Sequence, residues 1–155
     1  MGKRDLGLLL LRLGAGGILV VHGYPKLFGG PDKEVSPAVA SFLGPDYPGT
    51  VKSGGKEAFA NALRSMDVPE PEIAALASGL AEFGGGLALM LGAATGPAGL
   101  AAAANMAVAS YKAHGKRGLA SQGGYEFSAL LGICALALAL TGPGAISVDH
   151  LFGQD

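Results

Sequence analysis

Four long apolar stretches set the pattern of hydrophobic and polar positions along this chain. They cover about residues 6–23, 72–94, 97–114 and 125–142, so each holds about 18 to 23 residues. An α-helix rises about 1.5 Å per residue, and about 20 residues are therefore enough to cross the hydrocarbon core of a bilayer. The pattern predicts four membrane-spanning helices.

A soluble bundle of buried helices is the alternative to a membrane protein. Each helix of such a bundle would carry a polar stripe facing the solvent, whereas the stretches at 72–94 and 125–142 carry none. Composition favours the membrane, because 15% of the residues are charged, against about a quarter in a typical soluble domain. We therefore predict an all-α integral membrane protein whose four-helix bundle forms one domain over residues 1–155.

The first stretch also has features of a cleaved signal peptide, since Lys3 and Arg4 precede a run of leucines. Arg12, however, interrupts the apolar region, and no small-residue cleavage site leads into a soluble domain. We expect this stretch to be retained as the first span.

The loop of about 50 residues between the first two spans divides into two parts. Residues 24–49 are rich in proline and glycine, and we predict no long regular structure there. In the second part, four apolar side chains follow the i, i+3, i+4, i+7 spacing of a helix face: Phe59, Ala62, Leu63 and Met66. A short amphipathic helix that ends near Pro69 should lie on the membrane surface or over the mouth of the bundle.

Four spans would place both termini on one membrane face, and the long loop and the loop at 115–124 on the other. Lysines and arginines are more numerous near the spans on this second face. We therefore expect that face to be cytoplasmic and the protein to be a multi-pass protein of the inner cell membrane. The net charge is −1, which offers no attraction for nucleic acid as a partner.

Two ionisable residues fall inside the predicted spans. Arg12 lies about seven residues into the first span, and Glu82 lies near the centre of the second. A charge in the hydrocarbon core costs about 3 kcal/mol on insertion scales, so both side chains should face the bundle interior, where we expect them to pair. The pair is either a structural contact that fixes helix packing or a site that handles protons or substrate.

Small residues predict which face of the second span carries Glu82. Ser78, Glu82 and Gly86 are spaced by four positions, a pattern that lets two helix backbones approach closely. The third span is mostly alanine with Asn105 inside it, and this amide could donate a hydrogen bond to a buried acid. Glu82 is therefore expected on a close-packed face and not toward lipid.

A second polar cluster is predicted where the spans reach the face of the long loop. His22 and Lys26 end the first span, His114 ends the third, and Glu126 begins the fourth. A histidine pair from facing helices could ligate haem or a metal, but histidines at a membrane interface need no such role, and we assign no metal. Glu126 also suits the first turn of a helix, because its charge complements the helix dipole. We predict a polar pocket at this mouth.

The candidate redox chemistry is limited by what the chain lacks. Cys134 is the only cysteine, so dithiol chemistry within the chain and a structural zinc site are excluded. The sequence holds no dinucleotide, flavin or haem-attachment fingerprint. If electrons pass through this protein, a bound quinone or the cofactor of a partner protein would carry them.

The order of these polar motifs resembles the DoxX family of small four-span membrane proteins. Arg12 followed by His22-Gly23-x-x-Lys26 looks like the start of that family. Glu82-x-x-Gly85-Gly86-Leu87-x-Leu89-x-x-Gly92 is similar to its second-span signature. The parts similar to its third span, fourth span and C-terminal end are His114, Glu126 and Gly142-Pro143-Gly144-x-x-Ser147-x-Asp149. The resemblance covers nearly the whole chain except the long loop.

Relatives in this family are linked to membrane redox work. One branch forms a subunit of a thiosulfate:quinone oxidoreductase, and another is tied to a membrane complex with superoxide dismutase and a sulfurtransferase. The resemblance implies a membrane subunit of a redox, quinone-linked or oxidative-stress-response system, with membrane lipid, quinone and soluble redox proteins as partners. A shared fold does not by itself transfer chemistry, and whether the chain is itself an oxidoreductase stays open.

Under this hypothesis Arg12 and Glu82 form the catalytic centre, and four residues bind a quinone head group or small anion: His22, Lys26, His114 and Glu126. The alternative is a non-enzymatic carrier of a small solute or lipid, or an assembly scaffold, that uses the same pocket without electron transfer. The sequence lacks a clear inverted repeat, which makes transport the weaker version of this alternative. A purely structural membrane protein would need no ligand at all.

Overall fold

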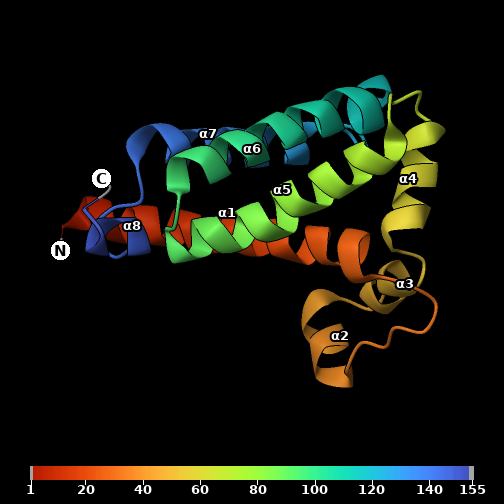
Figure 1. Ribbon diagram of the computed structural model, residues 1–155, viewed down its shortest axis with the longest axis horizontal. Helices are drawn as coiled ribbons and strands as arrows, with labels where there is room; N and C mark the ends of the chain where they lie inside the picture. Colours follow the sequence, from red (N-terminus) through yellow and green to blue (C-terminus); the bar gives the residue numbers. More distant parts are fainter. Residues whose placement is uncertain (1, 154–155) are drawn as a thin grey trace.

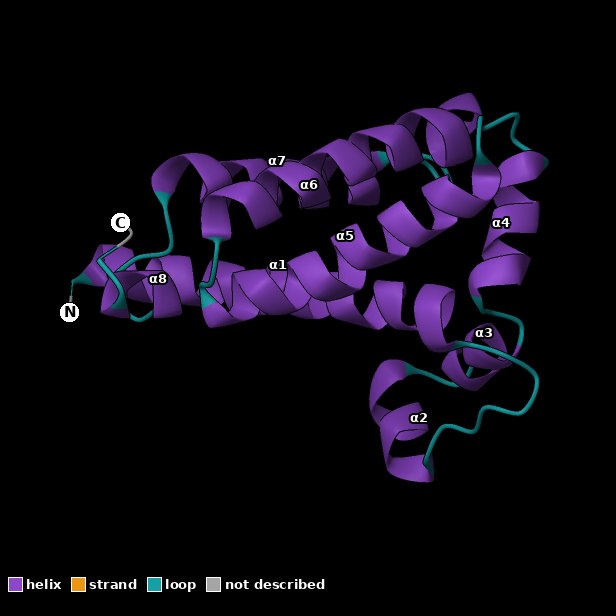
Figure 2. Cartoon of the chain, viewed as in Figure 1, coloured by secondary structure: helices purple, strands orange, loops and turns teal. Residues whose placement is uncertain are grey.

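The computed structural model describes residues 2–153, and over that range the chain forms helices and no strands (Figures 1 and 2). The helices are α1 (Lys3–Phe28), α2 (Pro37–Leu43), α3 (Tyr47–Lys52), α4 (Lys56–Arg64), α5 (Pro71–Leu91), α6 (Thr95–Val108), the π-helix η1 (Ala109–His114), the 3-10 helix η2 (Gly115–Arg117), α7 (Glu126–Thr141) and α8 (Val148–Leu151). The predicted all-α class is confirmed.

Four helices form the body of the molecule. α1 packs against α5 and α7, and α6 packs against α5 and α7, so each of the four has two neighbours. Figure 1 shows them running along the long axis, with both chain ends at one end of the bundle and α2, α3 and α4 at the other. The long loop therefore covers the end of the bundle that is opposite to the termini, as predicted.

Two of the helices are long and apolar enough to cross a membrane. α1 has 26 residues and α5 has 21, with mean hydropathies of 1.8 and 1.5 over their most apolar windows. α7 is apolar but has 16 residues, and α6 has 14 and continues directly into η1. Of the four predicted spans, two thus have spanning length and composition.

The outward faces of the bundle helices are apolar. Large aliphatic side chains are exposed on all four: Leu10, Leu80, Leu100, Leu130, Ile133 and Leu140. Exposure of so much apolar area to water is unfavourable, so such a surface indicates contact with lipid or with another apolar partner. The interior, by contrast, holds the charged side chains of Arg12 and Glu82.

The proline- and glycine-rich part of the long loop contains two short helices that the sequence pattern does not predict. Pro37 stands in the first turn of α2, where its fixed φ suits a helix, and the Ser36 hydroxyl accepts a hydrogen bond from the amide of Val39. α3 likewise has a proline in its first turn. The predicted amphipathic helix is present as α4, whose Ala60 and Leu63 pack against Ala75 of α5. It ends at Arg64 and not near Pro69, and Ala62 of the predicted face is exposed.

α1 extends about five residues beyond the predicted first span. Pro25 usually disfavours a helical residue before it, but the helix continues to Phe28, and the Gly29 amide then donates to the Pro25 carbonyl at 3.0 Å. A Cβ atom on Gly29 would lie 2.4 Å from that carbonyl oxygen, so only glycine allows this ending. The extra turn carries Lys26 on the helix.

Glycines bring α1 and α5 into direct backbone contact. A Cβ atom on Gly23 would lie 2.4 Å from the backbone nitrogen of Phe83, and one on Gly16 would lie 2.6 Å from the carbonyl of Gly86. Gly79 of α5 leaves room for the side chain of Leu27 of α1. The predicted close-packing face of α5 is confirmed for Glu82 and Gly86, while Gly79 takes the place expected of Ser78.

The substitution Gly23→Ala tests this contact. The added methyl group would meet the backbone of Phe83 and the Cβ of Glu82, so we expect the free energy of unfolding to fall by about 1–3 kcal/mol. Gly14→Ala is the matched control, since a Cβ there meets nothing within 4 Å, and helix propensity alone should make it neutral or stabilising. Thermal unfolding in detergent, followed by circular dichroism, compares the two. Equal stabilities would contradict the contact.

Candidate functional site

The buried carboxylate of Glu82 is paired with Lys26. The Lys26 ammonium lies 2.6 Å from Oε1 of Glu82, and the Asn105 amide donates to the same oxygen at 2.9 Å. Glu82 is 2% exposed, and its second oxygen, Oε2, is buried with no hydrogen-bond partner among the described residues. The predicted hydrogen bond from Asn105 to a buried acid is confirmed. One oxygen thus binds two donors, and the other binds none in the part of the chain that the structure describes.

Three helices of the bundle and one of the loop assemble this cluster. Gly23 lets α1 approach α5 at Glu82, and Lys26 follows one turn later on α1. Asn105 comes from α6, and the Lys26 ammonium lies 4.6 Å from the centre of the Phe59 ring of α4. The ring face attracts the cation, which helps to fix its position. The ion pair offsets the cost of burying the Glu82 charge.

Two hollows meet at Lys26. The first, the α3–α4 hollow, has a volume of about 500 Å³ and is lined by His22, Lys26, Tyr47 and Phe59 among others. The second, the α5–α6 hollow, has a volume of about 580 Å³ and is lined by Lys26, Phe59, Asn105 and His114 with alanines of both helices. Both volumes lie in the range of small-molecule sites. Lys26 is 25% exposed, and Asn105 is half-buried in the wall of the α5–α6 hollow, so a ligand can reach both of these donors.

The structure brings His22 and His114 to these hollows but not to each other. His22 is exposed in the α3–α4 hollow, with its ring centre 5.8 Å from that of Phe127. His114 lines the α5–α6 hollow, and its Nδ1 lies 3.1 Å from the Gly123 carbonyl. Within residues 2–153, no group of three or more His, Cys, Asp or Glu side chains could hold a metal ion.

Glu126 lies apart from the cluster. It is exposed in the first turn of α7 and lines neither hollow. Its Oε2 atom lies over Gly124, where an added Cβ would come within 2.5 Å of it. At the N-terminus of α7 the negative charge of Glu126 interacts favourably with the helix dipole. This is the structural alternative to ligand binding that the sequence left open.

The predicted ion pair between Arg12 and Glu82 is wrong. Arg12 is 1% exposed, as expected, but its Nη2 donates to the Ile146 carbonyl and its guanidinium packs against Gly92. Glu82 lies beside Gly23 of α1. Gly23 follows Arg12 by eleven positions, so the two residues are about 16 Å apart along the helix. The register of the α1–α5 contact separates the two charges.

Asp149 of α8, the last residue of the C-terminal motif that resembles DoxX, is the acidic group near Arg12. Its Oδ1 and Oδ2 accept hydrogen bonds from the amides of Ala94 and Thr95, at 2.7 and 2.9 Å, at the start of α6. Its own amide donates to Gly92 at 2.8 Å. The carboxylate therefore caps a helix that begins 54 residues earlier. No local sequence pattern reveals such a cap, because the two partners are far apart in the chain.

The segment around Asp149 closes the terminal end of the bundle. Asp5 accepts a hydrogen bond from the Ala145 amide at 3.1 Å, and Arg4 donates to the Thr141 carbonyl at 3.1 Å. We call this arrangement of Arg12, Gly92, Ile146 and Asp149 the C-terminal clasp. Its Arg12 nitrogens Nε and Nη1 are buried without hydrogen-bond partners among the described residues.

The environment of Asp149 lowers the pKa of its carboxyl group. Burial raises the pKa, but the hydrogen bonds from Thr95 and Ala94 and the charge of Arg12 lower it by more, so the pKa lies below its ordinary value of 3.8. The ionised form is thus favoured in the folded state. The resulting stabilisation is present above about pH 3.8 and is lost as the pH falls through the folded-state pKa.

Comparison with known proteins identifies the family. A family model for DoxX matches residues 7–115. The chain belongs to the DoxX family. The matched range contains Arg12, His22, Lys26, Glu82 and His114, while Glu126 and Asp149 lie beyond it. A search of curated proteins gave no match, and a comparison with solved structures gave none either. The chain is therefore a membrane protein of the DoxX type, in agreement with its apolar helices.

A double-mutant cycle on Lys26 and Glu82 tests the ion pair. Lys26→Met leaves Glu82 buried without its cation, and we expect it to lower the free energy of unfolding by about 3–5 kcal/mol. Glu82→Gln should cost less, about 1–3 kcal/mol, because glutamine can still accept from Asn105 and Lys26 can reach solvent. The double variant should be closer to Glu82→Gln than to the sum. Unfolding in detergent measures all three, with the exposed Lys52→Met as control; strict additivity would contradict the pair.

The pH dependence of stability tests the C-terminal clasp. The wild-type melting temperature should fall between pH 5 and pH 3 in part because Asp149 becomes protonated and the capping bonds weaken. Asp149→Asn removes this titration, so its melting temperature should be lower at pH 6 and should change less down to pH 3. Asp46→Asn, at the exposed start of α3, is the control and should keep the wild-type slope. Parallel curves for wild type and Asp149→Asn would exclude this role.

Proposed function

We propose that this DoxX protein is the membrane subunit of a quinone-linked redox or oxidative-stress-response system and that it binds the quinone head group at Lys26, Glu82 and Asn105. One observation carries the proposal: a buried carboxylate, one oxygen of which has no partner within residues 2–153, lies behind a cation that two hollows reach. Ionisable groups at such depth in membrane proteins tend to mark paths for protons or substrates.

The chemistry of a quinone fits the donors of the cluster. Its carbonyl oxygens accept hydrogen bonds, which the Lys26 ammonium and the Asn105 amide can donate. Reduction of a quinone to a quinol takes up two electrons and two protons, and the Glu82 carboxylate is placed to hold one of these protons. The electrons would come from a soluble redox partner, because the chain has a single cysteine.

The shape of the α5–α6 hollow also fits an amphipathic ligand. Lys26 and Asn105, two of its polar side chains, lie beside an apolar wall of alanines: Ala77, Ala81, Ala101 and Ala104. A quinone carries a polar ring on an apolar isoprenoid tail, and such a wall suits the tail. His22 and His114 would stand at the openings of the two hollows, where they can exchange protons with solvent.

The membrane arrangement is part of the same proposal. α1, α5, α6 with η1, and α7 would each cross the inner membrane, with the loop that carries α2 to α4 on the cytoplasmic side. Arg12 then lies at the opposite end from the cluster, so we assign it to the C-terminal clasp and not to catalysis. Lys26 takes its place as the cation next to Glu82.

A carrier of a small solute is the second candidate. It is favoured by the fact that two hollows meet at one charged residue, Lys26, from different sides. Such a carrier would move its solute past the ion pair without any change in the redox state of a quinone. The same hollows would serve a lipid-binding scaffold.

Glu82→Gln tests the proposed function. The change removes the acid but keeps the shape of the side chain, so we expect at least a tenfold loss of affinity for a short-chain ubiquinone and loss of quinone reduction in membrane vesicles. Calorimetry with the protein in nanodiscs measures binding, and quinone absorbance measures reduction. Glu57→Gln, on the exposed face of α4, is the control and should behave as wild type.

Two outcomes would overturn the quinone proposal. The first is wild-type binding and reduction by a folded Glu82→Gln variant. The second is solute uptake into proteoliposomes that depends on Glu82 while the quinone redox state does not change, which would establish the carrier instead.

A further inference from the structure

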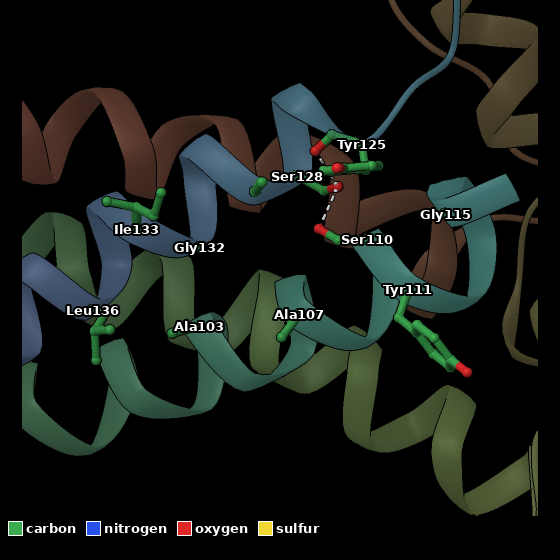
Figure 3. Close-up of a pocket in the computed structure, with 11 residues that line it drawn as sticks. Ala103, Ala107, Ser110, Tyr111, Gly115, Tyr125, Ser128, Gly132, Ile133 and Leu136 are labelled. Carbon is green, nitrogen blue, oxygen red and sulfur yellow. Dashed lines mark hydrogen bonds between the residues drawn. The ribbon is translucent and has the colours of Figure 1, made fainter. Parts of the chain in front are cut away.

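A separate groove runs between α6 with η1 and α7 (Figure 3), on a different side of α6 from the α5–α6 hollow. Its volume is about 600 Å³. Its lining is mainly small and apolar: Ala103, Ala107, Ala129, Gly132, Ile133 and Leu136, with Ser110, Tyr111, Gly115, Tyr125 and Ser128 at one end. The α5–α6 hollow uses Ala101, Ala104 and Asn105 of the same helix, so the two sites use different faces of α6.

The polar groups of this groove gather at one end. Figure 3 shows Ser110, Ser128 and Tyr125 close together, and Leu136, Ile133 and Ala103 at the opposite end. The hydroxyl oxygens of Ser110 and Ser128 lie 2.8 Å apart. From Ser110 back to Ala103, α6 and η1 rise about 10 Å, and from Ser128 to Leu136 α7 rises about 12 Å. The groove is therefore a short apolar channel with a hydroxyl-lined end.

Local packing explains why the space exists. α6 and α7 touch at Gly99, where a Cβ would lie 2.6 Å from the Ala135 carbonyl, and they remain close at Gly132. From Gly132 toward η1, the small side chains of Ala107, Ser110, Ser128 and Ala129 leave the outer side of the α6–α7 contact unfilled. The π-helix η1, which has a wider turn than an α-helix, begins at Ala109 near this space. π-Helices are rare in proteins, and those that occur often lie at functional sites.

Cations follow the polar end of the groove directly. Gly115 lines it, and Lys116 and Arg117 are the next two residues. Both are exposed, and neither forms a salt bridge within residues 2–153. Lysine and arginine at a membrane surface attract anionic lipid head groups, each by about 1 kcal/mol.

We propose that this groove binds an anionic phospholipid, with one acyl chain along Ala103, Ile133 and Leu136 and the phosphate near Lys116 and Arg117. The charge at the polar end favours a lipid over a second copy of the chain, because an apolar packed helix would leave Lys116 and Arg117 without a counter-charge. The site goes beyond the proposed quinone site and needs neither Lys26 nor Glu82.

Native mass spectrometry of the protein with dioleoyl phosphatidylglycerol or dioleoyl phosphatidylcholine tests this inference. Wild type should retain the anionic lipid at least tenfold more strongly than the zwitterionic one. Ala107→Phe fills the groove and should lose the bound lipid, whereas Leu100→Phe, exposed on the same helix outside the groove, should keep it. The Lys116→Ala/Arg117→Ala variant should lose the preference for the anionic lipid.

Three results would overturn the inference: equal retention of both lipids by wild type, equal retention by the Ala107→Phe and Leu100→Phe variants, or an unchanged preference in Lys116→Ala/Arg117→Ala. The last variant alters exposed residues only, so it decides the question even if Ala107→Phe fails to fold. Glu82→Gln should retain the lipid as wild type does, which separates this site from the quinone site.

Discussion

The contact between α1 and α5 is the constraint on which the rest of the structure depends. Glycines on both helices let their backbones touch, in a register that sets Gly16 beside Gly86 and Gly23 beside Glu82. In a hydrocarbon environment a charge without a partner is costly, so the register decides which charged residues the helices can carry and where. Glu82 is acceptable because Gly23 brings α1 close enough for Lys26 to reach it. The polar centre is thus a consequence of the glycine contact.

The same register places the two charge clusters at opposite ends of the bundle, in different settings. Lys26 is partly exposed and borders two hollows, and one oxygen of Glu82 has no partner among the described residues. Arg12 is closed in by Gly92 and by the segment around Asp149, which binds the start of α6. A group that must meet a ligand needs access and spare hydrogen-bonding capacity. Only the Lys26 cluster has both.

Much of the fold follows from the sequence, because apolar length and helical spacing are local properties. The burial of Glu82 and its bond to Asn105 also follow, since small residues mark the close face of α5 and an alanine-rich helix has one amide to offer. The identity of Lys26 as the partner of Glu82, however, does not follow from the sequence. It depends on α1 passing Pro25 to end at Phe28, and on glycine contacts that set a register between distant segments. The role of Asp149 was missed for the same reason, because its partners lie on α6.

The composition of α6 links the two proposed ligand sites. An alanine-rich helix occupies little space, so it packs closely where glycines face it and leaves room where they do not. One face borders the α5–α6 hollow and another borders the lipid groove. Both spaces are apolar along most of their length and polar at one end, which is the shape of a molecule with a head group and a tail. A bundle with larger side chains on this helix would fill both spaces. The alanines of α6 therefore favour a protein that holds amphipathic membrane molecules over one that only packs against itself.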